Sequence, residues 1–269
     1  MTDGPSQTGE SRRAAGRAET RARILAAAQE LIPTAETSLP VSAIARHAGV
    51  AIQTVYDQFG SKGGLLIAVV NQIQQSRGLF KAFGEVFRSP DGETAMRRMI
   101  EATVSFWDGA WPYVEFLLRS RRIDPVVARE MDFIDRLRHA HYWAIVRQLE
   151  AEGRLRAGQT ADMAADQAFA LTTPTIYEEL AVRREGTAHD AVETTTRAVL
   201  GAILEPGLAV APIVQPPDWA ALEQAAAARA REAGSDPARL SSEWAGSGPT
   251  IRPSDTAPRL ARPAERPRA

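Results

Sequence analysis

The chain has 269 residues and a formal net charge of −1, with 32 basic and 33 acidic side chains. This balance gives no global basic signal, and the absence of cysteine excludes disulfides and thiolate metal sites. No apolar run reaches the roughly 18 residues of a membrane span, and the polar N-terminus lacks the apolar core of a signal peptide. We therefore expect a soluble, cytoplasmic protein without a membrane partner.

The N-terminal part predicts a flexible arm followed by a helix. Residues 1–18 are rich in Gly, Ser, Thr and Arg, a composition typical of disorder. A helix is expected over residues 19–32, because apolar residues recur there on one helical face. Arginines cluster where the two segments join, at Arg12, Arg13, Arg17, Arg21 and Arg23.

The segment from Val41 to Leu66 has the spacing of two short helices around a tight turn, followed at once by a third helix. Gly49 ends the first short helix. In the second, Val55 and Phe59 face inward. The second helix of such a helix-turn-helix can lie in the DNA major groove. Its outward residues are Ile52, Gln53 and Tyr56.

Two stretches, ETRARILAAAQELI at 19–32 and AGVAIQTVYDQFGSKGGLL at 48–66, resemble the TetR/AcrR family of transcriptional regulators. The second stretch has Ala-Gly-Val, then Thr, a hydrophobic residue and Tyr, then Phe, Ser-Lys and Leu-Leu at the family's spacing. The chain departs from the family pattern at Leu39-Pro40, before the first short helix, and at Ala51, before the second, where members usually have Thr or Ser. The resemblance implies an all-helical, dimeric regulator with a C-terminal ligand-binding domain.

We therefore expect an all-α fold with four parts. They are a flexible arm over 1–18, a three-helix DNA-binding domain with the helix-turn-helix over 19–66, a helical ligand-binding and dimerisation domain over 67–205, and a C-terminal extension over 206–269. The extension is rich in Pro, Ala and Arg. Residues 218–233 could form one Ala-rich helix that docks on the ligand domain through Trp219 and Leu222, and the tail from Gly234 onward favours disorder.

Seven residues are candidates for contact with an operator in double-stranded DNA: Ser42, Ile52, Gln53, Thr54, Tyr56, Gln58 and Lys62. Gln53 offers a donor and an acceptor to an adenine edge, and Ile52 offers apolar contact to a thymine methyl group. By resemblance, Thr54, Tyr56 and Lys62 match phosphate-contacting positions of the family. The alternative is a solvated helix face. The N-terminal arginines equally fit an arm along the minor groove or backbone, or an ordinary solvated tail.

The second domain predicts helices over residues 61–87, 92–108, 111–121, 125–152, 160–184 with an interruption at Pro174, and 187–204. Aromatic residues concentrate there and could line an apolar pocket for a small-molecule effector. Each of them could instead simply fill the core. The candidates are Phe106, Trp107, Trp111, Phe116, Tyr142, Trp143, Phe169 and Tyr177.

The last two core helices are expected to build a four-helix homodimer interface. Its candidate residues are Ala164, Ala168, Leu171, Ile176, Val192, Thr196, Val199 and Ile203. Asp135 and His139 stand four residues apart, but a metal site needs further converging ligands, so we expect ion pairs there and no metal. No catalytic motif or cofactor loop stands out, and we expect neither an enzyme nor a cofactor.

These patterns predict a ligand-responsive regulator, most simply a repressor. It would bind a pseudo-palindromic operator as a homodimer, and a small, mostly apolar effector would release it. An activator would show the same pattern. The alternative from another class is a helical enzyme or small-molecule carrier with a degenerate DNA-binding head, because Ala51 and Ile52 depart from the usual recognition helix.

Overall fold

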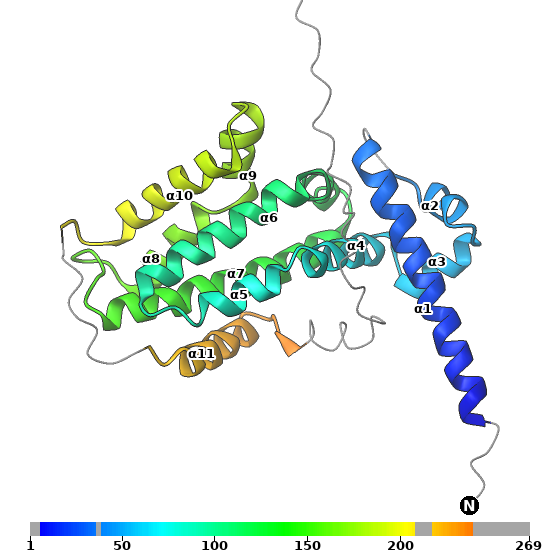
Figure 1. Cartoon of the computed structure of the whole chain (residues 1–269), viewed down its shortest axis with the longest axis horizontal. Helices are drawn as coiled ribbons and strands as arrows, with labels where there is room; N and C mark the ends of the chain where they lie inside the picture. The colour runs from blue at the N-terminus through cyan, green and yellow to red at the C-terminus, as the bar shows by residue number, and fades with distance from the viewer. Residues whose placement is uncertain (1–5, 36–38, 208–216, 239–269) are drawn as a thin grey trace, which may run out of the picture.

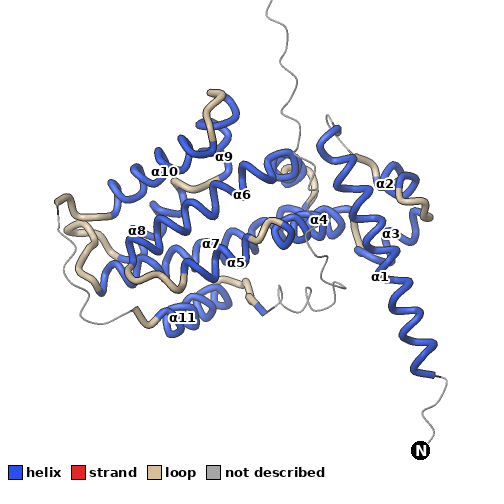
Figure 2. The backbone as a smooth tube through the Cα atoms, viewed as in Figure 1, coloured by secondary structure: helices blue, strands red, loops and turns tan. Residues whose placement is uncertain are grey.

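The computed structural model describes residues 6–35, 39–207 and 217–238, and its regular structure is helical (Figures 1 and 2). Within these ranges the one β contact is an isolated bridge between Leu155 and Leu204. The expected all-α class is therefore confirmed. Among the described residues, no helix is both long enough and apolar enough to cross a membrane.

A small head forms one end of the molecule (Figure 1). It contains α1 (Ser6–Leu31), the 3-10 turn η1 (Ile32–Thr34), α2 (Val41–His47), α3 (Ile52–Phe59) and the start of α4 (Lys62–Ser76). Its core includes Ile24, Ile44, Val55 and Leu65, none more than 1% exposed. Gly49 turns the chain between α2 and α3 with φ of 65°, a conformation open to glycine.

Helix α1 differs from the expected flexible arm, because residues 6–18 are already helical. Residues 1–5 lie outside the described part of the chain. The segment is rich in Ala and Arg, which are strong helix formers. Once the helix is nucleated by packing at residues 24–31, each further residue adds a hydrogen bond at low cost. The N-terminal half of α1 therefore projects beyond the head as a rod (Figure 1).

The body is built around two long helices, α6 (Gly92–Arg121) and α7 (Pro125–Ala151), with α5 (Leu79–Val86) alongside α6. Two boundaries differ from expectation. The helix expected over 61–87 breaks at Gly78, where φ is 69°. The break expected near Pro112 is absent and α6 continues, because buried residues follow one another across it on one face, from Phe106 and Ala110 to Val114 and Leu117.

On one side of this pair lie α8 (Ala161–Ala170), α9 (Pro174–Tyr177), the π-helical turn η2 (Glu178–Arg183) and α10 (Ala188–Ile203). The interruption predicted at Pro174 and the helix predicted over 187–204 are confirmed. A capping box starts α10, in which the Thr187 side chain accepts from the Asp190 amide and the Asp190 carboxylate accepts from the Thr187 amide.

The extension contributes α11 (Trp219–Glu232), which packs along α7 on the side away from α10 (Figure 2). Trp219 is buried, and its Nε1 donates to the Ser89 carbonyl at 2.7 Å. Ser235 is fully buried and accepts from Arg136 Nε at 2.7 Å. The predicted docked helix is confirmed, but disorder from Gly234 onward is wrong for residues 234–238. Residues 239–269 lie outside the described chain.

Candidate DNA-binding face and ligand site

Helix α3 presents an unusual outer surface. Its inner face is held by Val55, which is 1% exposed. On the outside, Ile52 and Tyr56 are 45% and 41% exposed, and Gln53 is exposed as well. Ile52 and Tyr56 stand one helical turn apart, and contiguous apolar surface that faces solvent is typical of an interaction site. The structure thus places the three outward residues where the helical spacing predicts them.

Gln53 and Asp57 form one unit on this surface. The Gln53 Nε2 donates to Asp57 Oδ1 at 2.8 Å, across one helical turn. The bond fixes the Gln53 amide along α3. The Asp57 carboxylate is therefore held on α3 by the same bond.

The remaining candidates border this surface. Ser42, Thr54, Gln58 and Lys62 are partly exposed. Lys62 is the first residue of α4, and Ser61 caps that helix by accepting from the Gly64 amide at 2.9 Å. A lysine here stands beside free backbone N–H groups, which also attract a phosphate.

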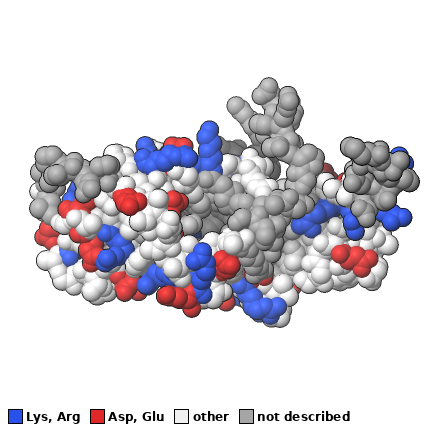
Figure 3. Space-filling view, turned by 90° about the horizontal axis from the view of Figure 1, so that it is seen from below, with Lys and Arg blue, Asp and Glu red and all other residues white. Residues whose placement is uncertain are grey.

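Arg21 anchors α1 to the end of α3. Its Nη1 donates to the Gln58 carbonyl at 3.2 Å, and its guanidinium lies 4.4 Å from the centroid of the Phe59 ring. This arginine therefore positions the recognition helix. In Figure 3, basic and acidic side chains mix over the visible face, both at the end that carries the head and along the body.

The eight aromatic candidates do not form one lining. Phe106 and Phe116 belong to the apolar cluster that joins the head to α6, whereas Tyr142 and Tyr177 belong to the cluster between α6, α7 and α8. Trp143 faces α8 and α11, where its Nε1 donates to Asp162 and the guanidinium of Arg229 lies over its ring. All eight are buried or partly buried: Phe106, Trp107, Trp111, Phe116, Tyr142, Trp143, Phe169 and Tyr177.

A buried arginine that the sequence analysis missed lies among these rings. Arg138 on α7 is 7% exposed, and its guanidinium lies 4.4 Å from the Phe169 centroid and 5.5 Å from the Trp107 centroid. Its Nη1 donates to the Thr172 carbonyl at 2.7 Å and its Nη2 to Asp135 at 3.2 Å. Its Nε has no hydrogen-bond partner among the described residues. The only sequence signal was an arginine at a core position of an amphipathic helix.

Tyr177 ties the α9 turn to α6. Its hydroxyl donates to Asp108 Oδ1 at 2.8 Å, and its ring packs against Trp111. Burial, followed by the hydrogen bond to the carboxylate, raises the pKa of Tyr177 well above its usual value. The hydroxyl therefore stays protonated and closes this side of the bundle. Asp135 and His139 do not meet, because Asp135 pairs with arginines and His139 contacts Asp166.

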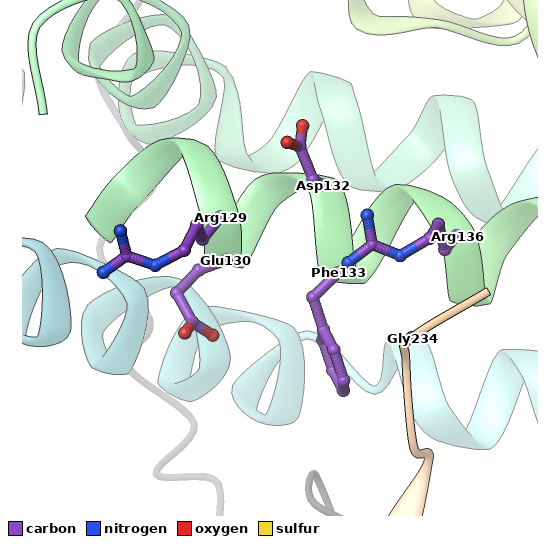
Figure 4. Close-up of a pocket in the computed structure, with 6 residues that line it drawn as sticks. All are labelled: Arg129, Glu130, Asp132, Phe133, Arg136 and Gly234. Carbon is purple, nitrogen blue, oxygen red and sulfur yellow. The ribbon is translucent and has the colours of Figure 1, made fainter. Parts of the chain in front are cut away.

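Two shallow hollows flank Arg136 on the surface between α7 and α11. One, of about 280 Å³, is lined by Arg129, Glu130, Asp132, Phe133, Arg136 and Gly234 (Figure 4). The other, of about 320 Å³, lies between α7 and the end of α11. None of the predicted aromatic residues lines either hollow. Within the described ranges, no group of three or more acidic or histidine side chains could hold a metal ion.

The dimer candidates need correction. Ala164, Ala168, Val199 and Ile203 have no exposed surface within the single chain, since they face the chain's own core between α7, α8 and α10. Thr196 is also buried. Helical spacing identified an apolar face, but not what covers it. Leu171, Ile176 and Val192 remain partly exposed and available to a partner.

Residues 24–69 match the family model described as bacterial regulatory proteins, tetR family. The N-terminal domain of this chain belongs to the TetR family. The match spans the helix-turn-helix built by α2 and α3, so the resemblance seen in the sequence is confirmed. The TetR head thus has the sequence pattern and the helix-turn-helix of this family's N-terminal domain. No curated protein matches the sequence.

Solved structures share the fold of the TetR head and body together. A transcriptional regulator from Saccharomonospora viridis in complex with choline is 18% identical, with a TM-score of 0.57, over 70% of this chain and 98% of that chain. NalD from Pseudomonas aeruginosa, a secondary repressor of a multidrug efflux pump, is 20% identical with a TM-score of 0.55, over 72% and 100%. SmeT in complex with triclosan is 22% identical with a TM-score of 0.54, over 74% and 98%.

Proposed function

We propose that this protein is a ligand-responsive transcriptional repressor that binds a pseudo-palindromic operator as a homodimer. The observation that carries the proposal is the outer face of α3, where Ile52, Gln53 and Tyr56 are exposed beside Lys62. Gln53 would read an adenine edge and Ile52 a thymine methyl group in the major groove. Thr54, Tyr56 and Lys62 would hold phosphates and set the register.

Repeated selection from random-sequence DNA tests the proposed DNA binding and needs no operator sequence at the start. We expect a palindrome whose half-sites lie about 34–36 Å apart, as two recognition helices of one dimer require. If the selected DNA molecules shared no common sequence, the proposed recognition of an operator would be contradicted. Transcription from a reporter promoter that contains the selected site then separates a repressor from an activator.

The dimer would form on the outward faces of α8, η2 and α10. Val182 on η2 is 41% exposed, and Leu171, Ile176 and Val192 lie partly exposed on neighbouring segments, so several apolar side chains face outward there. Val182→Glu should therefore give a folded monomer in light scattering. Val199→Glu is the contrasting variant, because it places a charge inside the chain's own core and should unfold the body. A dimer that survives Val182→Glu would place the interface elsewhere.

The effector site would lie around Arg138, between α6, α7 and α8. Structures of similar fold contain choline or triclosan, and those proteins bind small molecules on this architecture. In this chain, Arg138 offers an unpartnered buried Nε between two aromatic rings, so an aromatic ligand with an acceptor group would suit the site. Binding would favour one conformer of the dimer over the DNA-bound one, and the difference in affinity for the two conformers is the coupling energy.

Thermal-shift measurements with benzoate and benzamide test the ligand chemistry. We expect benzoate to raise the melting temperature of the wild type more than benzamide, because a carboxylate pairs with the guanidinium. Arg138→Met should abolish that difference while it preserves the packing of Trp107 and Phe169. An unchanged preference in Arg138→Met would show that Arg138 is not the anchor.

A further inference from the structure

The N-terminal part of α1 carries a concentration of positive charge that has no role in the DNA contacts proposed for the helix-turn-helix. From Ser6 to Arg23 the chain has five arginines and two glutamates, although the whole chain has a net charge of −1. Arg12, Arg13, Arg17 and Arg23 are all exposed. This segment precedes the match to the family model, which begins at residue 24.

The arginines occupy two different sides of α1. Arg13, Arg17 and Arg21 recur every four residues and so follow one side of the helix, the side that Ile24 continues into the core of the head. Arg12 and Arg23 are eleven residues, or about three turns, apart and share the other side.

Arg21 shows where the first of these sides leads. It contacts the Gln58 carbonyl and the Phe59 ring at the end of α3. At 1.5 Å per residue, Arg17 and Arg13 lie about 6 and about 12 Å further along the axis. DNA has a phosphate about every 3.4 Å along each strand, so these two side chains extend the basic surface by about two to four base pairs beyond the end of the recognition helix.

The direction of α1 decides which DNA it meets. In Figure 1 its N-terminal half runs toward the side of the molecule opposite α9 and α10. Since the proposed dimer face lies on η2 and α10, the two rods of a dimer would point away from the two-fold axis. They would therefore reach the outer flanks of an operator and not its central spacer.

We propose that residues 12–21 of α1 form a second DNA-binding element, a rigid basic helix that contacts backbone phosphates outside the operator half-sites. The inference rests on the proposed operator binding and adds to it a surface outside the helix-turn-helix. Its partner is the DNA backbone, because the arginines continue a surface that already touches the recognition helix. Such contacts add affinity without base preference and weaken as salt rises.

Fluorescence anisotropy with two duplexes tests this element. Both contain the same selected operator, and their outer flanks are about 2 or about 12 base pairs long on each side, the longer more than one helical turn. We expect the wild type to bind the longer duplex several-fold more tightly at low salt. Arg13→Ala/Arg17→Ala should bind both duplexes equally, and its log–log salt slope on the longer duplex should fall by about 0.9 for each phosphate that is no longer neutralised.

The matched control is Arg12→Ala/Arg23→Ala, which removes the same charge from the other side of the same helix. It should keep the gain from longer flanks. The inference is overturned if the wild type gains nothing from them, if Arg13→Ala/Arg17→Ala keeps the gain, or if both double variants lose it alike. Failure of the wild type to bind even the short duplex would instead overturn the proposed function, and the inference with it.

Discussion

Gly63 at the start of α4 lies directly against Val126 in the first turn of α7. A Cβ atom at position 63 would lie 2.7 Å from the Val126 Cβ and 3.1 Å from the Val127 backbone nitrogen. Gly63 follows Lys62, a candidate phosphate contact, and Val126 lies in the first turn of the helix that carries Arg138. The glycine thus allows α4 to lie close to the start of α7, the helix that carries the proposed ligand site.

Gly63→Ala should push α4 away from α7. Because both contacts are close and one is backbone, we expect a loss of about 1–3 kcal/mol in the free energy of unfolding, measured by urea denaturation. Operator affinity should change as well, since Lys62 moves with α4. Gly201→Ala is the control, because that helical glycine has open space around its Cβ position and alanine should be neutral or stabilising. Equal stability of both variants would contradict the packing described.

On the helix-turn-helix, substitutions of base-reading residues should change sequence preference, whereas substitutions of backbone-contacting residues should change overall affinity. Gln53→Ala should relax preference at one position of each half-site. Tyr56→Phe and Lys62→Ala should weaken binding to all sequences, with Lys62→Ala lowering the salt slope by about one phosphate's worth. Competition binding against a panel of single-base operator variants distinguishes the two classes. Unchanged sequence preference in Gln53→Ala would remove Gln53 from the reading face.

The bond between Gln53 and Asp57 predicts a further effect. Asp57→Ala removes a negative charge near the DNA, which should raise overall affinity. It also frees the Gln53 amide, so preference should relax at the same base position that Gln53→Ala affects. In a double-mutant cycle, the two substitutions should be non-additive in base preference. Additive effects would mean that Asp57 does not orient Gln53.

Because His141 is buried, we expect the protein to lose stability in acid. It packs edge-on against Phe83 and Phe87, and its Nδ1 has no hydrogen-bond partner in the described part of the chain. Burial lowers the pKa of His141 to about 4 from the usual 6.5. Below pH 6.5 the unfolded chain takes up a proton that the native state does not. The free energy of unfolding therefore decreases as the pH is lowered from 6.5 to about 4. The full loss is about 3 kcal/mol.

Urea denaturation between pH 4 and pH 7 checks this effect. His141→Phe should flatten the acid limb, because the new ring suits the neighbouring phenylalanines and does not titrate. His189→Gln, at the exposed start of α10, should leave the limb as in the wild type. An acid limb unchanged by His141→Phe would assign the proton uptake to other groups.

Two truncated chains should show which part of the C-terminal extension contributes to thermal stability. A chain ending at Ala238 keeps the buried Ser235 and its bond from Arg136, and its melting temperature should equal that of the full chain. A chain ending at Pro206 loses α11 and the buried Trp219, which exposes the apolar side of α7. Its melting temperature should fall by several degrees in calorimetry. Equal melting of both truncations would show that α11 contributes little to stability.

Sequence patterns within a few residues explain which turns, helix ends and breaks could be predicted. The turn at Gly49, the caps of α7 and α10 and the break at Pro174 depend on residues within one or two turns of each other, so their pattern is visible in the sequence. The outer residues of α3 follow from its inner ones by helical spacing. The helix boundaries that were predicted wrongly lie at Ser6, Gly78 and Pro112. They depend on whether packing elsewhere supports or overrides local helix propensity.

The sequence by itself determined the helical class, the helix-turn-helix and the side of α3 that faces outward, because each follows from short-range periodicity. Only the tertiary structure decided what covers each apolar face. It placed Ala168 and Val199 inside the chain and Arg138 between two aromatic rings, and it showed Ser235 buried beside Arg136 of α7. Periodicity reveals that a face is apolar, but the partner of that face comes from a distant part of the chain. That choice depends on how all the helices fill space together.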